Sequence, residues 1–466
     1  MTAREIHFIA GFGLFHGWLI ALLTYTGAAP LGIAGSFASA AVMLVGGMAA
    51  AAVFFAIGQG KEKRFASLAD GLLVLAVCLV LVVYFVPSTL LALLSCLACG
   101  FLCGSLHCLF GLASLAFSKD EFAPIIAWTT VVASLVAVGA FFAGDLLPDY
   151  VQTLVLVALP LASAVFLRRM QEGSKVTGPA IKGADTSSEK ISSRFVRLLA
   201  AVFLFGVVCR TCDVFSSARL TGQAVSSVSL FASHIVAAIV LVALLRKGRR
   251  PGSLAFFYRL ALPCSGAGFV LLALPGHALA ATSAGAVLLI GVGFEVINLI
   301  AWVLTSYAAL VAARPLRYFG LYVIATYAAM LVGRLVNVVV LPYAAGHAAF
   351  LGLICVVVLV VVVMVVLPED QVCLFEESLR LSAEEKAEGD VRRERCVAFA
   401  AAFGLTERET EVLELLVRGR TLKVVAERLT ISKGTAGTHI ANIYRKADVH
   451  KQQDLIDRFE QFDGAR

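Results

Sequence analysis

Apolar stretches of about twenty residues recur about twelve times before residue 368, and this repetition limits the fold more than any other feature. Each stretch is long enough to cross a hydrocarbon layer roughly 30 Å thick. Backbone groups in lipid must find hydrogen-bond partners within the segment, so these stretches are predicted to be α-helices. They cover residues 8–26, 32–58, 67–87, 89–117, 122–143, 150–167, 195–216, 224–245, 254–275, 279–310, 320–343 and 348–367.

The composition agrees with a polytopic membrane protein and excludes other classes. Hydrophobic residues make up 60% of the chain and charged residues 15%, whereas soluble domains carry about 25% charged residues. This excludes an intrinsically disordered chain and an ordinary cytosolic enzyme. No phosphate-binding glycine loop, nucleophile elbow or metal-ligand cluster of credible spacing is present, so we predict no enzymatic activity, cofactor or metal.

Basic residues are concentrated in alternate loops between the predicted spans. Cytoplasmic loops of membrane proteins are enriched in lysine and arginine, so we predict a multi-pass cell-membrane protein, in contact with the lipid bilayer, whose two termini are cytoplasmic. The basic residues of these loops are Lys61, Lys63, Arg64, Lys119, Arg168, Arg169, Lys175, Lys182, Lys190, Arg194, Arg246, Lys247, Arg249, Arg250, Arg259, Arg314 and Arg317.

The longest of these loops, 168–194, is rich in Gly, Ser and Lys and divides the predicted spans six and six. The resulting halves cover residues 1–167 and 195–367. In its layout this region resembles a major-facilitator-type bundle, in which two six-helix halves are joined by a cytoplasmic loop. The resemblance implies a transporter-like bundle, here with the role of a membrane sensor.

Three predicted spans of the C-terminal half carry ionisable and amide side chains in pairs three residues apart, which places each pair on one helix face. The pairs are Arg210 with Asp213, Glu295 with Asn298, and Arg334 with Asn337. Such residues are costly in lipid unless they are paired or hydrated. We predict that they line a cavity in this half that binds an unidentified polar small molecule. The alternative is a set of interhelical ion pairs, for instance between Arg334 and Glu295.

Other polar residues in the spans are interpreted as structural. Cys96, Cys99, Cys103 and His107 lie on one helix face, where small residues let two helices approach closely. The isolated residues His16 and His234 are likewise expected to serve packing.

Hydropathy falls sharply after Pro368, and the remaining chain is predicted to be soluble and cytoplasmic. Residues 368–402 form an acidic, mostly helical connector that we expect to be interrupted near Gly389. It could transmit a signal or act as a spacer, and we favour the spacer.

Residues 403–466 carry the signals of a soluble four-helix unit. Thr406 and Glu409 form the pattern of a capping box, and Gly419 ends the first helix. The second helix is predicted over 422–429, a third runs to about residue 447, and a fourth covers about 452–462. Two short helices joined by a tight turn are typical of a helix-turn-helix.

The segment LTERETEVLELLVRGRTLKVVAERLTISKGTAGTHIANIYRKADVHKQQDLID resembles the LuxR/GerE-type DNA-binding domain along its whole length. The resemblance implies that the third helix enters the major groove of double-stranded DNA and that the fourth helix supports a homodimer on paired half-sites. The residues expected to contact DNA are Ser432, Lys433, Thr435, Thr438, His439, Asn442, Arg445, Lys446 and Lys451.

Taken together, these features predict a membrane-anchored one-component transcriptional regulator that senses a small molecule through its membrane bundle. The alternative is a secondary transporter whose tail binds DNA or protein. For three of the residues expected to contact DNA we also consider a structural role. His439 is expected to pack against the turn, and Lys446 and Lys451 are either DNA contacts or solvated surface charges.

Overall fold

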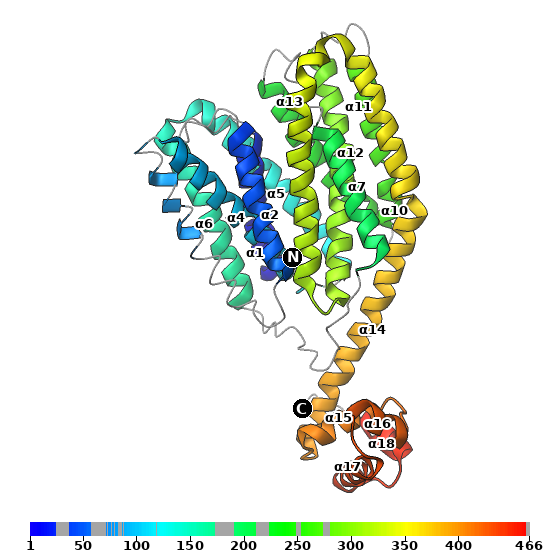
Figure 1. Cartoon of the computed structure of the whole chain (residues 1–466). Helices are drawn as coiled ribbons and strands as arrows, with labels where there is room; N and C mark the ends of the chain where they lie inside the picture. The colour runs from blue at the N-terminus through cyan, green and yellow to red at the C-terminus, as the bar shows by residue number, and fades with distance from the viewer. Residues whose placement is uncertain are drawn as a thin grey trace. The chain divides into compact units, whose positions relative to one another are not determined.

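Figure 1 shows the computed structural model of the chain, which describes residues 1–24, 37–56, parts of 71–87, 88–117, 119–172, 191–210, 223–247, 253–273 and 280–462. These residues are almost entirely helical, and no strand occurs among them. They form two compact units, Met1–Arg380 and Leu381–Arg466. The predicted all-α architecture is therefore confirmed over the described ranges.

The first unit is a bundle of long apolar helices. In chain order they are α1 (Ala3–Thr24), α2 (Phe37–Ala56), α4 (Thr89–Ser114), α5 (Lys119–Leu146), α6 (Asp149–Glu172), α7 (Ser193–Arg210), α9 (Gln223–Lys247), α10 (Ser253–Tyr258), α11 (Ala261–Ala273), α12 (Ala280–Val311), α13 (Pro315–Val361) and the π-helix η3 (Val362–Val366). Within the bundle α1 packs on α5 and α6, α2 on α4 and α13, and α12 on α9 and α11.

Every predicted span overlaps a described helix. Within the described ranges, nine helices are long and apolar enough to cross a membrane, and two shorter apolar helices, Leu73–Val82 and Val228–Ala243, coincide with two further spans. The remaining span is α7, which has 18 residues but includes three arginines. The last two predicted spans lie in and beyond one long helix, α13, which is kinked where His347 leaves helical backbone angles.

Helices α2 and α4 approach so closely that glycine is required between them. A Cβ atom on Gly100 would collide with the backbone of Met43, and one on Gly104 would collide with the carbonyl oxygen of Gly47. Cys99 and Cys103 of the same helix are buried in the hydrophobic core. This geometry supports the interpretation of the cysteine-rich span as a closely packed helix face.

The connector differs from its prediction, because α14 (Glu369–Ala402) runs without interruption through Gly389. A glycine within a helix lowers the stability of the helix by up to about 1 kcal/mol relative to alanine. Packing contacts at both ends of α14 outweigh this cost at Gly389. Residues up to Arg380 belong to the first unit, where Val372, Phe375 and Leu379 enter the bundle core. The helix therefore contributes residues to both units, and whether it transmits a signal or serves as a spacer stays a prediction.

Polar contacts hold the beginning of α14 to α10 and the residues that follow it. The guanidinium group of Arg259 forms an ion pair with the carboxylate of Glu369 at 2.8 Å. Just before α14, the hydroxyl of Tyr258 donates to the carbonyl oxygen of Leu367 at 2.5 Å. Two turns further, the carboxyl group of Glu376 is buried, and its Oε2 has no hydrogen-bond partner among the described residues.

The buried carboxyl of Glu376 predicts that the stability of this attachment depends on pH. Burial raises the pKa of Glu376 to about 7, although Arg380 and the backbone N–H of Leu254 act in the opposite direction. The folded protein then holds a proton that the unfolded chain loses near pH 4.5, so stability falls as the pH rises from 4.5 to about 7 and then levels off. We expect the thermal midpoint of the full chain in detergent to decline over this window.

The Glu376→Gln variant should lose most of that decline, because it cannot ionise. The neighbouring Glu377 is exposed, so Glu377→Gln serves as the matched control and should keep the wild-type profile. An unchanged pH profile in Glu376→Gln would show that Glu376 does not titrate in this window.

Candidate functional site

The second unit contains the predicted helices almost residue for residue. Its helices are α15 (Glu407–Leu416), α16 (Leu422–Leu429), α17 (Lys433–Lys446) and α18 (Gln452–Gln461). Gly419 has a φ of 70° after α15, a left-handed conformation that glycine adopts without strain. Thr430 has a φ of 55° at the end of α16, which turns the chain sharply into α17. The helix-turn-helix arrangement is confirmed.

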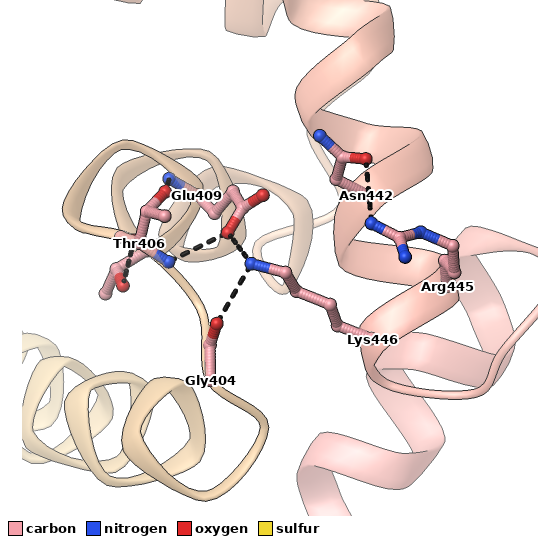
Figure 2. Close-up of polar contacts among 7 residues, drawn as sticks. Gly404, Thr406, Glu409, Asn442, Arg445 and Lys446 are labelled. Atoms are coloured by element: carbon pink, nitrogen blue, oxygen red, sulfur yellow. Dashed lines mark hydrogen bonds and ion pairs between the residues drawn. The ribbon is translucent and has the colours of Figure 1, made fainter.

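A polar network links the start of α15 to the end of α17 (Figure 2). The predicted capping box is confirmed, since the hydroxyl of Thr406 accepts from the N–H of Glu409 and the carboxylate of Glu409 accepts from the N–H of Thr406. The same carboxylate lies 2.6 Å from the ammonium group of Lys446, which also donates to the carbonyl oxygen of Gly404 at 2.9 Å. The carboxylate of Glu409 thus caps the N-terminus of α15 and also forms an ion pair with Lys446.

The network keeps Glu409 ionised although it is almost completely buried. Burial alone raises the pKa of this carboxyl group, but the hydrogen bonds from Lys446 and Thr406 outweigh it, and the net pKa is below the ordinary value. The side chain of Lys446 is 25% exposed. The structure therefore gives Lys446 a structural partner, and its predicted contact with DNA stays a prediction.

One face of α17 is exposed along its length. Ser432 begins the helix by accepting from the N–H of Thr435 at 3.0 Å. Exposed residues then recur every three or four positions, at Thr435, Thr438, Ala441 and Arg445. Asn442, which is half-buried, lies on this face and accepts from Arg445 at 3.4 Å (Figure 2). The opposite face is anchored in the domain core, so the exposed face is rigidly presented.

The remaining candidates lie beside this face or at its ends. Lys433 is exposed at the first turn of α17, and His439 is half-buried. The ammonium group of Lys451 is exposed and lies 3.5 Å from Asp454. In α18, Leu455 and Phe459 are buried in the domain's own core.

The end of α14 belongs to the same domain, which the sequence interpretation had not anticipated. Cys396 and Phe399 are fully buried in its hydrophobic core. The guanidinium group of Arg395 donates to the carbonyl oxygens of Glu460 and Phe462 at 2.6 and 2.8 Å and so caps the end of α18. A stable domain therefore starts within α14, upstream of residue 403.

The first unit contains a cavity between helices of both predicted halves. Its empty volume is about 870 Å³, including the part that is open to solvent. The polar and aromatic residues that line it are Phe12, His16, His107, Thr129, Thr130, Arg210, His234, Phe294, Glu295, Asn298, Trp302, Tyr322, Thr326 and Tyr327. The cavity was predicted within the C-terminal half, and the structure corrects this, because α1, α4 and α5 form one of its walls.

Three of the six residues predicted to bind a ligand line this cavity, namely Arg210, Glu295 and Asn298. Arg334 and Asn337 are not among its lining residues, and the side-chain amide of Asn337 donates to the carbonyl oxygen of Arg210 at 2.8 Å. Asp213 lies outside the described residues.

Three histidines that were interpreted as packing residues also line the cavity. The rings of His16 and His107 are 4.8 Å apart, and the Nε2 of His234 lies 3.5 Å from the carboxylate of Glu295. Each histidine is isolated in the sequence, so their proximity follows from the packing of α1, α4 and α9. Glu295 was found because Asn298 lies three residues further on its own helix, whereas no histidine of the three has an ionisable or amide residue at that spacing.

Comparisons with known proteins address the two units separately. Residues 404–459 match the family described as bacterial regulatory proteins, luxR family. Over 52 residues the chain is 49% identical to the spore germination protein GerE of Bacillus subtilis (strain 168), which covers 11% of this chain and 70% of GerE. The chain is also 46% identical over 52 residues to the uncharacterized response regulatory protein YgeK of Escherichia coli (strain K12). This match covers 11% of this chain and only 35% of the length of YgeK.

The fold of the first unit resembles that of membrane transporters. A bacterial homologue of the iron transporter ferroportin, in an outward-facing state, superposes with a TM-score of 0.59 at 13% sequence identity. The match covers 81% of this chain and the whole of that one, 100%. At this identity the likeness shows the fold alone, which is the major-facilitator-like bundle predicted from the layout of the spans.

Proposed function

The chain belongs to the luxR family of bacterial regulatory proteins through its C-terminal domain, and from this premise we propose that it is a membrane-embedded one-component transcriptional regulator. In the proposal, α17 occupies the major groove of promoter DNA, and a small molecule bound in the membrane bundle controls that occupancy. Both termini are cytoplasmic, as the distribution of basic residues predicts.

The exposed face of α17 is the observation on which the DNA-binding proposal rests. Thr435, Thr438, Asn442 and Arg445 share one face, and their hydroxyl, amide and guanidinium groups are types that reach phosphates or base edges. Ser432 and Lys433 extend the face at the N-terminus of the helix, and His439, Lys446 and Lys451 border it. We propose that two such domains bind paired half-sites as a homodimer.

Residues 403–466 contain 11 Lys and Arg against 10 Asp and Glu, so non-specific attraction to phosphates contributes little. Binding would then depend mainly on the contacts made by α17. This makes the recognition face sensitive to single-charge changes.

The cavity supports the sensing part of the proposal. Its two walls come from opposite halves of the bundle, so a ligand that contacts both walls would favour one arrangement of the halves over another. The beginning of α14 is packed on the C-terminal half, and its end is part of the DNA-binding domain. A change in the bundle would therefore reach the domain through α14.

A secondary transporter with a regulatory tail is the alternative. The observation that favours it is the His234–Glu295 pair in the cavity wall, a type of ionisable pair that transporters use to couple substrate to protons. Substrate flux in vesicles that contain residues 1–380 alone would support it.

We would test the regulator by crosslinking the full-length protein to DNA in its host and sequencing the recovered fragments. Thr438→Glu combined with Asn442→Glu places two negative charges on the proposed recognition face and should abolish discrete promoter peaks. The control is Val391→Glu combined with Val397→Glu, which adds the same charge at positions of the same unit that are 66% and 56% exposed. Peaks that persist at wild-type height in the first double variant would contradict DNA binding through α17.

A further inference from the structure

Two buried polar atoms of the residues that line the cavity have no hydrogen-bond partner in the part of the chain that the structure describes. The indole Nε1 of Trp302 and the imidazole Nε2 of His107 are both unpaired, and both residues are at most 3% exposed. Buried polar groups almost always form hydrogen bonds. Because Trp302 and His107 line the same cavity, their two free N atoms indicate that a bound molecule supplies the missing hydrogen bonds.

Other polar groups of the cavity wall already have partners within the protein. The hydroxyl of Tyr322 donates to the side chain of Asn298 at 2.5 Å, and the Nδ1 of His234 contacts the carbonyl oxygen of Leu230 at 2.7 Å. Thr129 and Thr326 donate to backbone carbonyls of their own helices. Trp302 and His107 therefore differ from these neighbours.

The chemistry of the two unpaired atoms defines what they bind. An indole N–H is a donor only, so Trp302 requires an acceptor. The Nδ1 of His107 lies 3.3 Å from the hydroxyl of Tyr327, and when that hydroxyl donates, the Nε2 of His107 carries the proton and becomes a second donor. The two rings are 5.3 Å apart between centroids, so both donors belong to the same part of the cavity wall.

The surroundings of these donors are aromatic. The ring of Phe12 lies 5.0 Å from that of Trp302, and the ring of Tyr322 lies 5.2 Å from it. Aromatic walls favour a flat apolar body that stacks or meets them edge-on. Arg210 also lines the cavity and would favour a negative charge on the ligand, whereas Glu295, a second lining residue, is paired with His234 and would oppose it.

We propose that the cavity binds a small aromatic molecule through a hydrogen-bond-accepting carbonyl or carboxylate group, held by the N–H groups of Trp302 and His107. This inference rests on the sensing function proposed above and names the class of molecule that is sensed.

The test uses the full-length protein in detergent and three probes with the same naphthalene body. They are 2-naphthoate, 2-naphthamide and 2-naphthylmethylammonium, which carry an anionic acceptor, a neutral acceptor and a cationic donor. We expect the first two to raise the temperature at which the protein loses its monodisperse state, and the third to leave it unchanged. A larger shift with naphthoate identifies a carboxylate ligand, whereas a larger shift with naphthamide identifies a neutral carbonyl ligand.

Two matched substitutions locate the effect. Trp302→Phe keeps an aromatic ring and removes the N–H, so it should weaken the binding of both acceptor probes about tenfold, the value of one hydrogen bond in a buried site. The buried indole N–H of Trp18 also has no partner among the residues that the structure describes, but Trp18 does not line the cavity, so Trp18→Phe should leave probe affinity unchanged. Equal stabilisation by the ammonium probe, no stabilisation by either acceptor, or unchanged affinity in Trp302→Phe would overturn the inference.

The inference and the proposed function fail in different ways. If neither acceptor probe binds but the promoter peaks depend on Thr438 and Asn442, the ligand class is wrong and the regulator stands. If the probes bind as expected but no promoter peak is found, the ligand class stands and the regulator is wrong.

Discussion

The Lys446→Met variant of a fragment covering residues 381–466 is expected to unfold about 2–3 kcal/mol more easily than the parent fragment. The substitution leaves the carboxylate of Glu409 buried and without its cation, and an uncompensated buried charge is strongly destabilising. The partial exposure of Lys446 keeps the loss below that of a fully buried pair. The fragment has its own hydrophobic core, and urea unfolding followed by circular dichroism measures the change.

A second substitution separates the structural role of Lys446 from contact with DNA. Glu409→Gln added to Lys446→Met removes the unpaired charge, while the amide oxygen still accepts from the N–H of Thr406. Most of the lost stability should return. If DNA affinity returns with it, Lys446 acts by holding α15 and α17 together. If the domain refolds but DNA affinity stays low, Lys446 contacts the phosphates, and the structural explanation is insufficient.

The Gly100→Ala substitution should destabilise the membrane unit by at least about 1–3 kcal/mol, the usual cost of overpacking. The added methyl group would meet backbone atoms of Met43, which cannot rotate away as a side chain could. Helices α2 and α4 would have to separate, and this contact is one of the largest in the bundle. The measurement is the thermal midpoint of the full-length protein in detergent.

The matched control is Gly139→Ala in α5. No atom of the described residues outside its own helix turn lies within 4 Å of a Cβ at this position, and alanine favours a helix over glycine by up to about 1 kcal/mol. The control should therefore keep or slightly raise the midpoint, so the two identical substitutions have opposite signs. A similar fall in both variants would refute close packing of α2 on α4.

The second unit could be predicted from its sequence nearly to the residue because its boundaries depend on local chemistry. Thr406, Gly419 and Ser432 each fix a helix end through a hydrogen bond or a left-handed turn that involves neighbours in the chain. The membrane helices were equally predictable, since hydropathy over twenty residues is also a local property. Helix positions therefore needed no knowledge of the tertiary fold.

What escaped prediction depends on contacts between distant segments. The sequence places His16 and His107 on separate helices with nothing to link them, yet their rings meet in the cavity. Gly389 predicts an interruption of the helix, but both ends of α14 pack against other segments, and the local sequence does not show this packing. For Lys446, a basic residue near a recognition helix looks the same in sequence whether it faces DNA or a buried carboxylate.

The attachment of α14 makes the two halves of the bundle unequal. Leu254, Tyr258 and Arg259, which contact the start of α14 or the residue just before it, all belong to the C-terminal half. Among the described residues, these contacts join α14 to the C-terminal half, so in the proposed regulator a movement of that half is the one passed on to α14. From this arrangement we propose that substitutions in the N-terminal half act only through ligand binding, whereas substitutions where the C-terminal half meets α14 uncouple the DNA-binding domain while ligand binding stays intact.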